Sequence, residues 1–237
     1  IDDRERVSDC LGKITVSGRH LLSLINEVLD MSQIERGGLT LAMEKFDLPE
    51  LVDSVVSIVR PISEQHGHDL AIRVNDIRHE AVVGDLIRIQ QALVNILSNA
   101  VKYTPDGGRI SFDISEKPTN STKTACYEVI IEDNGCGMSE DFLRIIFDPF
   151  TRADAKRTTK IPGTGLGMTI TKNIISMMNG TINVASKPGQ GSRFTVTFCL
   201  QLRSEEEVSV SGLSDLPVLV VDDDRICCES AVKMLNE

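Results

Sequence analysis

A narrow apolar seam along the first 35 residues constrains the fold more tightly than any other pattern in the chain. Its members lie alternately four and three residues apart, which is the heptad pattern of a helix that packs along a partner helix. The seam predicts one long helix over about residues 4–35, ended by Gly37 and Gly38. So narrow a stripe needs a covering helix, and we expect that helix to lie in a second chain or outside this sequence. The seam consists of Val7, Leu11, Ile14, Gly18, Leu21, Ile25 and Val28.

Strand-like and helix-like periods then follow one another as far as residue 202. Several of the strands are joined as hairpins, which favours antiparallel pairing. We therefore expect an α+β fold, a two-layer sandwich of a mixed, mostly antiparallel sheet covered by helices on one face, preceded by the long coiled-coil-type helix. Helices are expected near 47–64, 85–103 and 166–178, with a short helix beginning after Ser139. Strands are expected near 39–43, 70–74, 109–115, 127–132 and within 181–202.

Composition and charge exclude several classes of function. Of the 237 residues, 41% are hydrophobic and 25% are charged, as in an ordinary folded domain. The formal net charge of -10 makes nucleic acid and anionic lipid surfaces poor partners, and no apolar run approaches the ~18 residues of a membrane span. The six cysteines show neither a CxxC pair nor zinc-ligand spacing, so we expect the reduced thiols of a cytosolic protein.

A first glycine-containing segment, Asp133–Met138, directly follows the apolar strand Val129–Ile131. A carboxylate at a strand end can accept a hydrogen bond from an exocyclic amine, and the glycines beside it let the backbone approach a flat base. The alternative interpretation is a tight turn with no ligand.

A second segment, Gly163–Met168, opens a helix. Backbone N–H groups at a helix N-terminus, with glycines removing side-chain bulk, can cradle phosphates. The segment is neither a Walker loop, since no GK[ST] follows, nor GxGxxG, since residue 168 is Met. A flexible hinge is the alternative interpretation.

A third group lies on the helix that precedes both segments. Asn95, Asn99, Lys102 and Tyr103 share one face of it, opposite the apolar face. Because Mg²⁺ binds few protein oxygens beside phosphate oxygens and water, one asparagine carbonyl is an adequate protein ligand. A solvated helix face is the alternative.

Between the two glycine segments, Phe147–Phe150 encloses a proline and suggests a hydrophobic clasp. Four basic residues follow, namely Arg152, Lys156, Arg157 and Lys160. They suggest a mobile lid that offers positive charge to a polyphosphate, although charge runs are more often simply solvated.

Taken in order, these segments resemble the four boxes of the histidine-kinase catalytic domain, within the gyrase, chaperone, histidine-kinase and mismatch-repair ATPase superfamily. The boxes read QQALVNILSNAVKYTP, EDNGCGM, FDPF and GTGLGM, and the resemblance covers about residues 1–202. It implies that ATP and Mg²⁺ are the cofactors. The implied ATP site comprises Asn95, Asn99, Lys102, Tyr103, Asp133, Gly135, Gly137, Phe150, Arg152, Lys156, Gly163, Thr164, Gly165, Leu166 and Gly167.

The same resemblance implies a role for several of these residues. Asp133 would read the adenine amino group and Asn99 would bind Mg²⁺, whereas Asn95, Lys102 and Tyr103 would line the phosphate side. The glycines of the second segment would shape the end of the lid.

Both ends of the chain resemble parts of a hybrid sensor kinase. Residues 17–37 resemble the second helix of the dimerisation hairpin, whose first helix carries the phosphorylated histidine, and this implies a homodimer. His20 lies on the wrong helix, so we expect it to be a packing or surface residue. VLVVDDD near the C-terminus resembles the first strand of a receiver domain. The expected parts are therefore 1–37 (hairpin helix), 38–202 (ATP-binding domain), 203–216 (linker) and 217–237 (receiver start).

We therefore expect a protein-histidine kinase that transfers the γ-phosphoryl group of ATP to a histidine outside this sequence. A receiver domain is the expected partner, and the expected location is the cytoplasm, with the parent protein attached to a membrane. One alternative is an ATP-hydrolysing machine of the same superfamily, but such enzymes carry a glutamate base where this chain has Asn95. A non-catalytic nucleotide-sensing or dimerisation module is the other alternative.

Overall fold

The structure is a computed structural model that describes residues 2–152 and 164–203. Nearly all of the expected linker and all of the expected receiver start fall outside these ranges, as do Lys156 and Gly163 of the predicted site. Among the described helices, none is both long enough and apolar enough to span a lipid bilayer.

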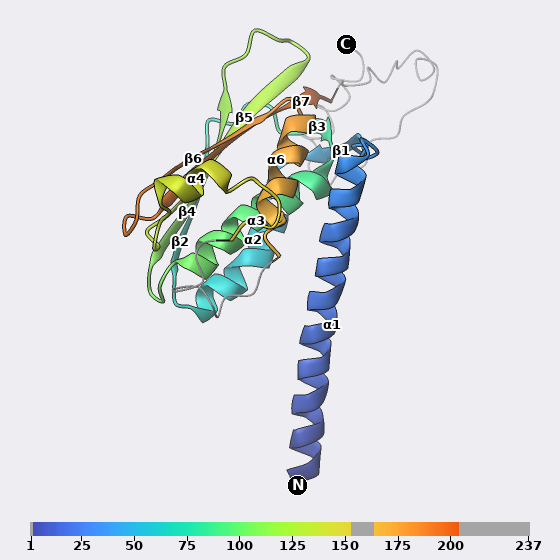
Figure 1. Cartoon of the computed structure of the whole chain (residues 1–237). Coiled ribbons are helices and arrows are strands. Elements are labelled where there is room, and N and C mark those ends of the chain that lie inside the picture. The colour runs from blue at the N-terminus through green and yellow to red at the C-terminus, as the bar shows by residue number, and fades with distance from the viewer. Residues whose placement is uncertain (1, 153–163, 204–237) are drawn as a thin grey trace, which may run out of the picture. The chain divides into compact units, whose positions relative to one another are not determined.

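The residues of the heptad seam lie on one long helix, as predicted. This helix, α1, spans Asp2–Glu35 (Figure 1). After it, the amide groups of Gly37 and Gly38 donate to the carbonyls of Ile34 and Gln33, which ends the helix. The large seam side chains are exposed, with exposed fractions from 47% to 67%, so the described part of the chain does not cover them. These side chains are Val7, Leu11, Ile14, Leu21, Ile25 and Val28.

The strand predicted over residues 39–43 is wrong. The Ala42 amide donates to the side chain of Asp85 at 2.9 Å, instead of to a neighbouring strand. The alternation of Leu39 and Leu41 therefore reflects an extended segment that packs one face on the core, and not a strand hydrogen-bonded to a neighbouring strand. The first strand, β1, is Glu44–Asp47, and it pairs with β3, Ala81–Gly84, a strand that the sequence pattern did not reveal.

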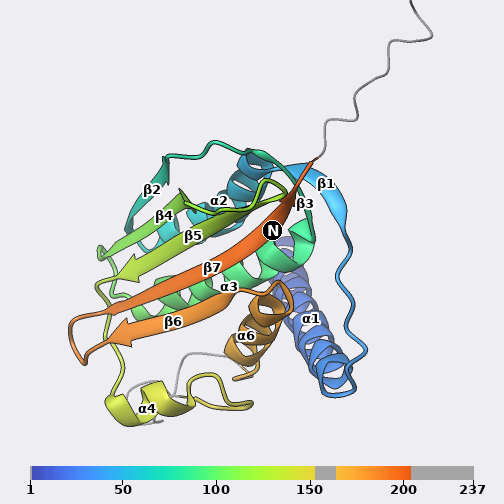
Figure 2. The ribbon, with the colours of Figure 1, turned by 90° about the horizontal axis from the view of Figure 1, so that it is seen from above.

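In the described residues, seven strands form one sheet with the order β1-β3-β7-β5-β4-β2, and β6 pairs with β7 (Figure 2). The β2–β4 pair is parallel, whereas the other pairs are antiparallel. This confirms the expected mixed, mostly antiparallel sheet. The remaining strands are β2 (Asp69–Asn75), β4 (Arg109–Lys117), β5 (Thr124–Asp133), β6 (Thr181–Ser186) and β7 (Ser192–Leu202).

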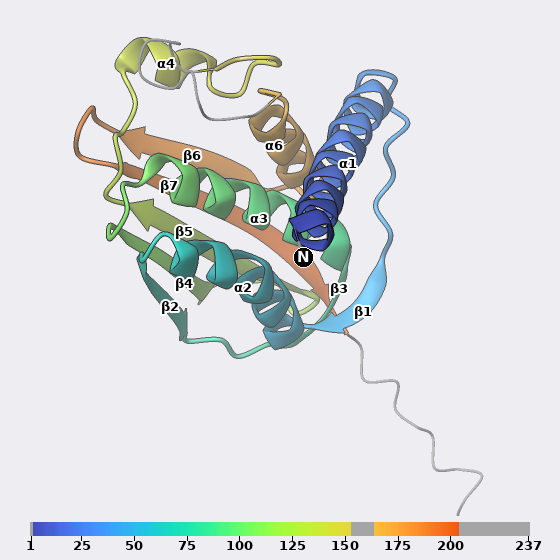
Figure 3. The ribbon, with the colours of Figure 1, turned by 90° about the horizontal axis from the view of Figure 1, so that it is seen from below.

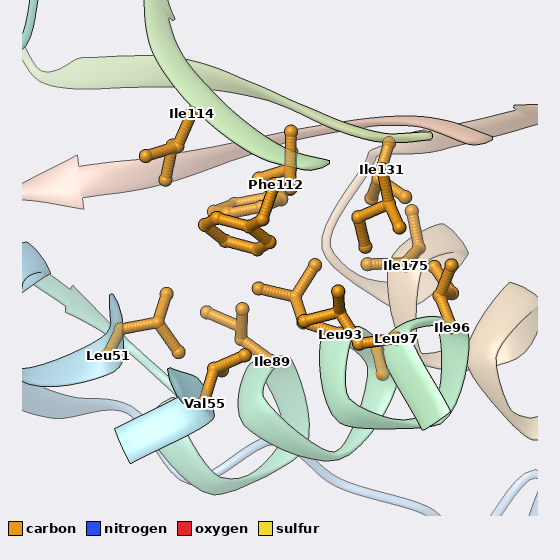
Figure 4. Close-up of a cluster of buried hydrophobic side chains, with 14 of the residues drawn as sticks. Leu51, Val55, Ile89, Leu93, Ile96, Leu97, Phe112, Ile114, Ile131 and Ile175 are labelled. Atoms are coloured by element: carbon orange, nitrogen blue, oxygen red, sulfur yellow. The ribbon is translucent and has the colours of Figure 1, made fainter. Parts of the chain in front are cut away.

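Three helices cover one face of this sheet, as Figure 3 shows from the helix side. They are α2 (Leu48–Gln65), α3 (Leu86–Tyr103) and α6 (Gly167–Met177), and the short α4 (Glu140–Ile145) follows β5 in the chain. The two-layer α+β architecture is thereby confirmed. In Figure 4, Phe112 and Ile131 of the sheet point toward Leu93 and Leu97 of α3, and these side chains are almost completely buried.

Two cysteines depart from the expectation of reduced thiols. Cys126 and Cys199 face each other on β5 and β7 and form a disulfide across 73 residues of sequence. No local sequence pattern predicts this pair, because the register between β5 and β7 is set only when the sheet forms. Cys10 and Cys136 are free and exposed, as expected.

Candidate functional site

Helix α3 carries the core on one face and the predicted polar stripe on the other. Its N-cap residue, Asp85, accepts a hydrogen bond from the Arg88 amide at 2.9 Å, which fixes where the helix begins. On the polar stripe, Asn95, Asn99 and Tyr103 are half-buried and Lys102 is exposed. The opposite face consists of Ile89, Leu93, Ile96, Leu97 and Ala100, all buried against the sheet and the neighbouring helices.

The asparagines of the stripe face α6. Asn95 donates its side-chain amide to the hydroxyl of Thr171 at 2.8 Å, and Asn99 donates to the sulfur of Met168 at 3.3 Å. Because the Asn99 nitrogen is used in this contact, its carbonyl oxygen is the atom that suits a hard cation such as Mg²⁺. The asparagine side chain therefore fits the metal-binding role that the sequence implies.

Asp133 ends β5 as a buried carboxylate with 8% of its surface exposed. Its Oδ1 accepts a hydrogen bond from the Gly135 amide at 2.8 Å. Burial raises the pKa of the Asp133 carboxyl above its ordinary value of 3.8, while N–H donation from Gly135 and Ser192 opposes the rise and the charge of Glu132 adds to it. Because each carboxylate oxygen has two lone pairs, the group can accept a further hydrogen bond from a base.

The turn after Asp133 is held between the end of α3 and the β6–β7 turn. The Cys136 amide donates to the Tyr103 carbonyl at 3.1 Å, and the Cys136 carbonyl accepts from the Gly189 amide at 2.7 Å. Gly137 has a φ of 64°, and a Cβ there would lie 1.9 Å from the Lys187 carbonyl oxygen. Glycine is therefore required at 137 by both its backbone conformation and the close approach of another chain segment.

The second glycine segment leads into α6 directly beside the asparagine stripe. A Cβ at Gly167 would lie 2.5 Å from the side-chain oxygen of Asn95, so any larger residue there would displace the Asn95 amide. The N-cap residue of α6, Leu166, is buried and has no side-chain oxygen to accept from the first amides. Within the described residues, the N-terminus of α6 therefore has no side-chain cap, and its first N–H groups and positive dipole end suit a phosphate.

Thr164 connects this segment to α1. Its hydroxyl donates to the carboxylate of Glu27 and accepts from the Leu166 amide at 3.2 Å. Nearby on α1, the buried Asp30 accepts from the side chains of Arg88 and Gln91, both at 2.9 Å. The C-terminal part of α1 thus contacts both α3 and the segment before α6.

The phenylalanine segment forms only half of the expected clasp. Phe147 packs against the core, its carbonyl accepts from the Thr169 hydroxyl at 2.9 Å, and the Lys172 ammonium lies 5.3 Å from its ring centre. Phe150 is instead 70% exposed, with a φ of 61°. The expectation that both rings form a clasp is therefore wrong for Phe150.

Electrostatics link Arg152 to the end of α3. Burial raises the pKa of the Tyr103 hydroxyl, the nearby charge of Arg152 opposes this rise, and Cys136 adds to it. Arg152, the last described residue before 164, therefore lies near Tyr103. The structure thus brings the polar stripe of α3, the end of β5, the start of α6 and Arg152 into one region.

A family model described as "Histidine kinase-, DNA gyrase B-, and HSP90-like ATPase" matches residues 84–202, which contain all of these elements. The chain belongs to this ATPase family.

Relatives within the family are sensor kinases. The autoinducer 2 sensor kinase/phosphatase LuxQ of Vibrio parahaemolyticus is 34% identical over 220 residues, which cover 88% of this chain and 25% of LuxQ. The sensor protein GacS of Pseudomonas syringae pv. syringae is 36% identical over 207 residues, which cover 87% of this chain and 23% of GacS. The chain therefore spans about a quarter of the length of these curated relatives.

Solved histidine kinases have the same fold. Full-length ShkA in complex with AMPPNP superposes with a TM-score of 0.65 and 27% identity, covering 79% of this chain and 37% of ShkA. The histidine kinase AdeS of Acinetobacter baumannii superposes with a TM-score of 0.60 at 23% identity, covering 79% of this chain and 82% of that one. This member of the ATPase family is thus the ATP-binding catalytic domain of a sensor histidine kinase.

Several contacts of this candidate site were missed from sequence. Thr171 and Met168 hold the two asparagines, and both could have been found by projecting residues 167–177 as a helix, where they are three residues apart. Ser192 donates to Asp133, and Glu27 accepts from Thr164. These last two have no sequence signal, because they depend on strand register and on how α1 lies against α6.

Proposed function

We propose that this domain binds Mg-ATP and transfers its γ-phosphoryl group to a histidine on a helix that pairs with α1. The observation that carries the proposal is the placement of two features at the two ends of the asparagine stripe of α3. The turn after the buried carboxylate of Asp133 lies against Tyr103, and the N-terminus of α6 lies against Asn95. A carboxylate suits a base amine at one end, and helix N–H groups suit phosphates at the other. A nucleotide is the ligand that has both groups.

In this proposal each side chain binds or orients one part of the nucleotide. Asp133 accepts from the adenine amino group, and Gly135 and Gly137 let the backbone approach the base. Asn99 offers its carbonyl oxygen to Mg²⁺, which neutralises charge on the phosphates when bound. Asn95, Lys102 and Tyr103 line the phosphate side, and Gly163, Thr164, Gly165, Leu166 and Gly167 form its cradle.

The basic residues before this cradle supply the lid. Arg152 already lies near Tyr103, which supports a role beside the nucleotide. Lys156 and Phe150 complete the proposed ATP site. Since phosphoryl transfer depends mainly on positioning and charge neutralisation, these groups are the domain's contribution to the reaction.

The contact of Asn95 favours phosphotransfer over ATP hydrolysis. A hydrolytic site needs a general base to activate water, whereas an asparagine amide has no basic group. Here its nitrogen is also tied to the Thr171 hydroxyl at 2.8 Å. We therefore propose that an imidazole from outside this sequence, and not water, accepts the phosphoryl group.

The proposed partners follow from α1 and from the sensor-kinase relatives. The exposed seam of α1 would be covered in a homodimer of the parent protein. A receiver domain, in the same chain or a separate one, would then take the phosphoryl group from the histidine. We place this domain on the cytoplasmic side of a membrane, where ATP is available.

Thermal unfolding with a non-hydrolysable ATP analogue and Mg²⁺ tests nucleotide binding. A ligand at about 100 times its dissociation constant stabilises the fold by ~2.7 kcal/mol, which raises the melting temperature of a domain of this size by roughly 5–10 °C. The matching GTP analogue should shift it less, because guanine carries no amino group at the position that Asp133 would read. An equal shift, or none, contradicts the proposal.

Labelled ATP tests the acceptor. The 237-residue chain should bind ATP without forming phosphohistidine, because His20 is followed by Leu21 and Leu22 and not by an acid that could take its proton. A longer chain with the pairing helix should become labelled, and replacing that helix's histidine should abolish the label. Acid-labile label on the short chain that disappears on His20→Gln would place the acceptor on α1 instead.

A further inference from the structure

The disulfide between Cys126 and Cys199 lies in an unusual place for a protein that uses ATP. Both residues are half-buried, and their neighbours Tyr127 and Phe198 point the other way into the core. Because successive strand residues face opposite sides, the two sulfurs lie on the face of the sheet opposite to the core and the helices that cover it. A reagent in solution can therefore approach the pair without opening the core.

The compartment argues against a permanent cross-link. ATP-dependent kinases work in compartments that hold ATP, and the cytosol keeps thiols reduced, so disulfides there are mostly transient or redox-sensing. We propose that Cys126 and Cys199 are a reversible thiol–disulfide site that small-molecule disulfides oxidise and small-molecule thiols reduce. This inference rests on the proposed cytoplasmic location, but its test does not require nucleotide binding.

The exchange balances with two small thiols as products. A thiolate at one cysteine attacks a sulfur of a small disulfide, which forms a mixed disulfide and releases one small thiolate. The thiolate at the other cysteine then attacks the protein sulfur of the mixed disulfide, and a second small thiolate leaves. The two cysteine protons pass to the two released thiolates. The protein loses two electrons and the small disulfide gains them.

Strand pairing keeps the two cysteines together in either state. Ten residue pairs join β5 to β7, and the Cα atoms of Cys126 and Cys199 lie 4.0 Å apart in this register. Reduction therefore breaks one covalent bond without removing the backbone ladder. The folded domain should exchange as it stands, without unfolding first.

Oxidation should change stability and leave the nucleotide site unchanged. The bond closes a 73-residue loop that contains Asp133 and the start of α6, so it restricts the unfolded chain. Within the folded strands, Cys126 is seven residues from Asp133, or about 23 Å at ~3.3 Å per residue. The cross-link is thus remote from the carboxylate proposed to read the base.

The test uses the whole chain with Cys10, Cys136, Cys227 and Cys228 changed to serine, so that only the pair remains. The folded protein is equilibrated with oxidised glutathione and then with reduced glutathione, and free thiols are counted by mass after alkylation. We expect both thiols to disappear with a Cys126–Cys199 cross-linked peptide, and both to return in native buffer. Retained thiols, stable mixed disulfides without a cross-link, or thiols that return only in denaturant would each overturn the proposal.

Urea unfolding then measures the consequence. Closing a 73-residue loop should lower the unfolding equilibrium constant of the oxidised form about 10³-fold, which corresponds to a melting temperature roughly 10 °C higher. The matched control, with Cys126→Ser and Cys199→Ser added, should unfold alike in both glutathione buffers. Equal midpoints for the oxidised and reduced pair would overturn the proposed effect.

Nucleotide titration of both forms separates the two proposals. Equal affinities in the oxidised and reduced forms support the separation of the disulfide from the site, and a large difference overturns it. If neither form binds nucleotide while the thiols still exchange, the proposed function fails and the redox site stands.

Discussion

Replacing Asp133 with asparagine should remove adenine recognition and leave the fold intact. The carboxylate has two acceptor oxygens: Oδ1 accepts from the Gly135 amide at 2.8 Å, and the Ser192 amide also donates to the group. An asparagine has the same shape but only one acceptor oxygen. The single asparagine oxygen can accept from the backbone amides or from the adenine amine, but not from both sides. In either case the asparagine NH₂ group faces another hydrogen-bond donor.

The expected loss follows from the charge on this acceptor. A hydrogen bond to a charged group contributes about 1.5–3 kcal/mol, so ADP and ATP should each bind roughly 10- to 150-fold more weakly. Folding should not suffer in the same way. Burial raises the pKa of the Asp133 carboxyl, which means that the folded protein disfavours its charge, and a neutral residue removes that cost.

Calorimetric titration with two ligands isolates the contact. One ligand is ADP, and the other is the purine riboside diphosphate that lacks the exocyclic amine. The wild-type domain should prefer ADP by about 10- to 150-fold, and Asp133→Asn should reduce this preference to near one. Glu132→Gln is the matched control, because it removes the same charge from the adjacent, exposed residue whose side chain pairs with Arg193 on the other face.

Two outcomes would refute this reasoning. If Asp133→Asn binds ADP as tightly as the wild-type domain, the carboxylate does not read the base. If the variant loses ADP and the amine-free analogue equally, with an unchanged melting temperature, then Asp133 shapes the pocket without contacting the amine.

Three further predictions concern the metal, the turn and pH. In Asn99→Ala, the ratio of ATP-analogue affinities with and without Mg²⁺ should fall toward one, whereas metal-free ADP binding should be unchanged. A ratio in calorimetry equal to that of the wild-type domain would reject the metal role. Gly137→Ala should lower the melting temperature by several degrees more than Gly189→Ala, because both have positive φ but only a Cβ at 137 meets the Lys187 carbonyl. ADP affinity should fall on acidification at a pH above 3.8, because protonation removes the Asp133 acceptor and its pKa is raised; this loss should be absent from Asp133→Asn.

The pH dependence of stability has the opposite sign to the usual aspartate case. Because the folded-state pKa of Asp133 is raised, the folded protein holds this proton more tightly than the unfolded chain does. Protonation of the group therefore favours folding below 3.8, and this contribution is lost as the pH rises through the folded pKa. Comparing urea midpoints of the wild-type domain and Asp133→Asn across this range isolates the contribution.

Local periodicity was sufficient to predict most elements of this fold. The heptad seam gave α1, the Asp85 N-cap marked the start of α3, and period-two alternation located β2, β4 and β5. It failed at residues 39–43, where the alternation reflects packing of an extended segment whose Ala42 amide bonds to a side chain. It also missed β3, because four residues are too short to show a period.

The placement of candidate site residues was predictable where it depends only on the residue's own segment. Asn95 and Asn99 share a face because they are one helical turn apart, and Gly137 follows a strand end at which the chain must turn. The exposure of Phe150 and the Cys126–Cys199 pair were not predictable in this way. Both depend on which surfaces meet after folding, and neither produces a periodic pattern in the sequence.

Helix α3 explains why the site cannot be separated from the core. With 3.6 residues per turn, Leu93, Ile96 and Leu97 pack under the sheet while Asn95 and Asn99, interleaved among them, face α6. A core substitution that rotates or shifts α3 must therefore move the asparagines against α6 as well. Conversely, a ligand that bridges α3 and α6 stabilises the same packing, because it binds only the folded arrangement. Stability and nucleotide affinity should accordingly change together for core substitutions in α3, and independently for substitutions on the helix-free face of the sheet.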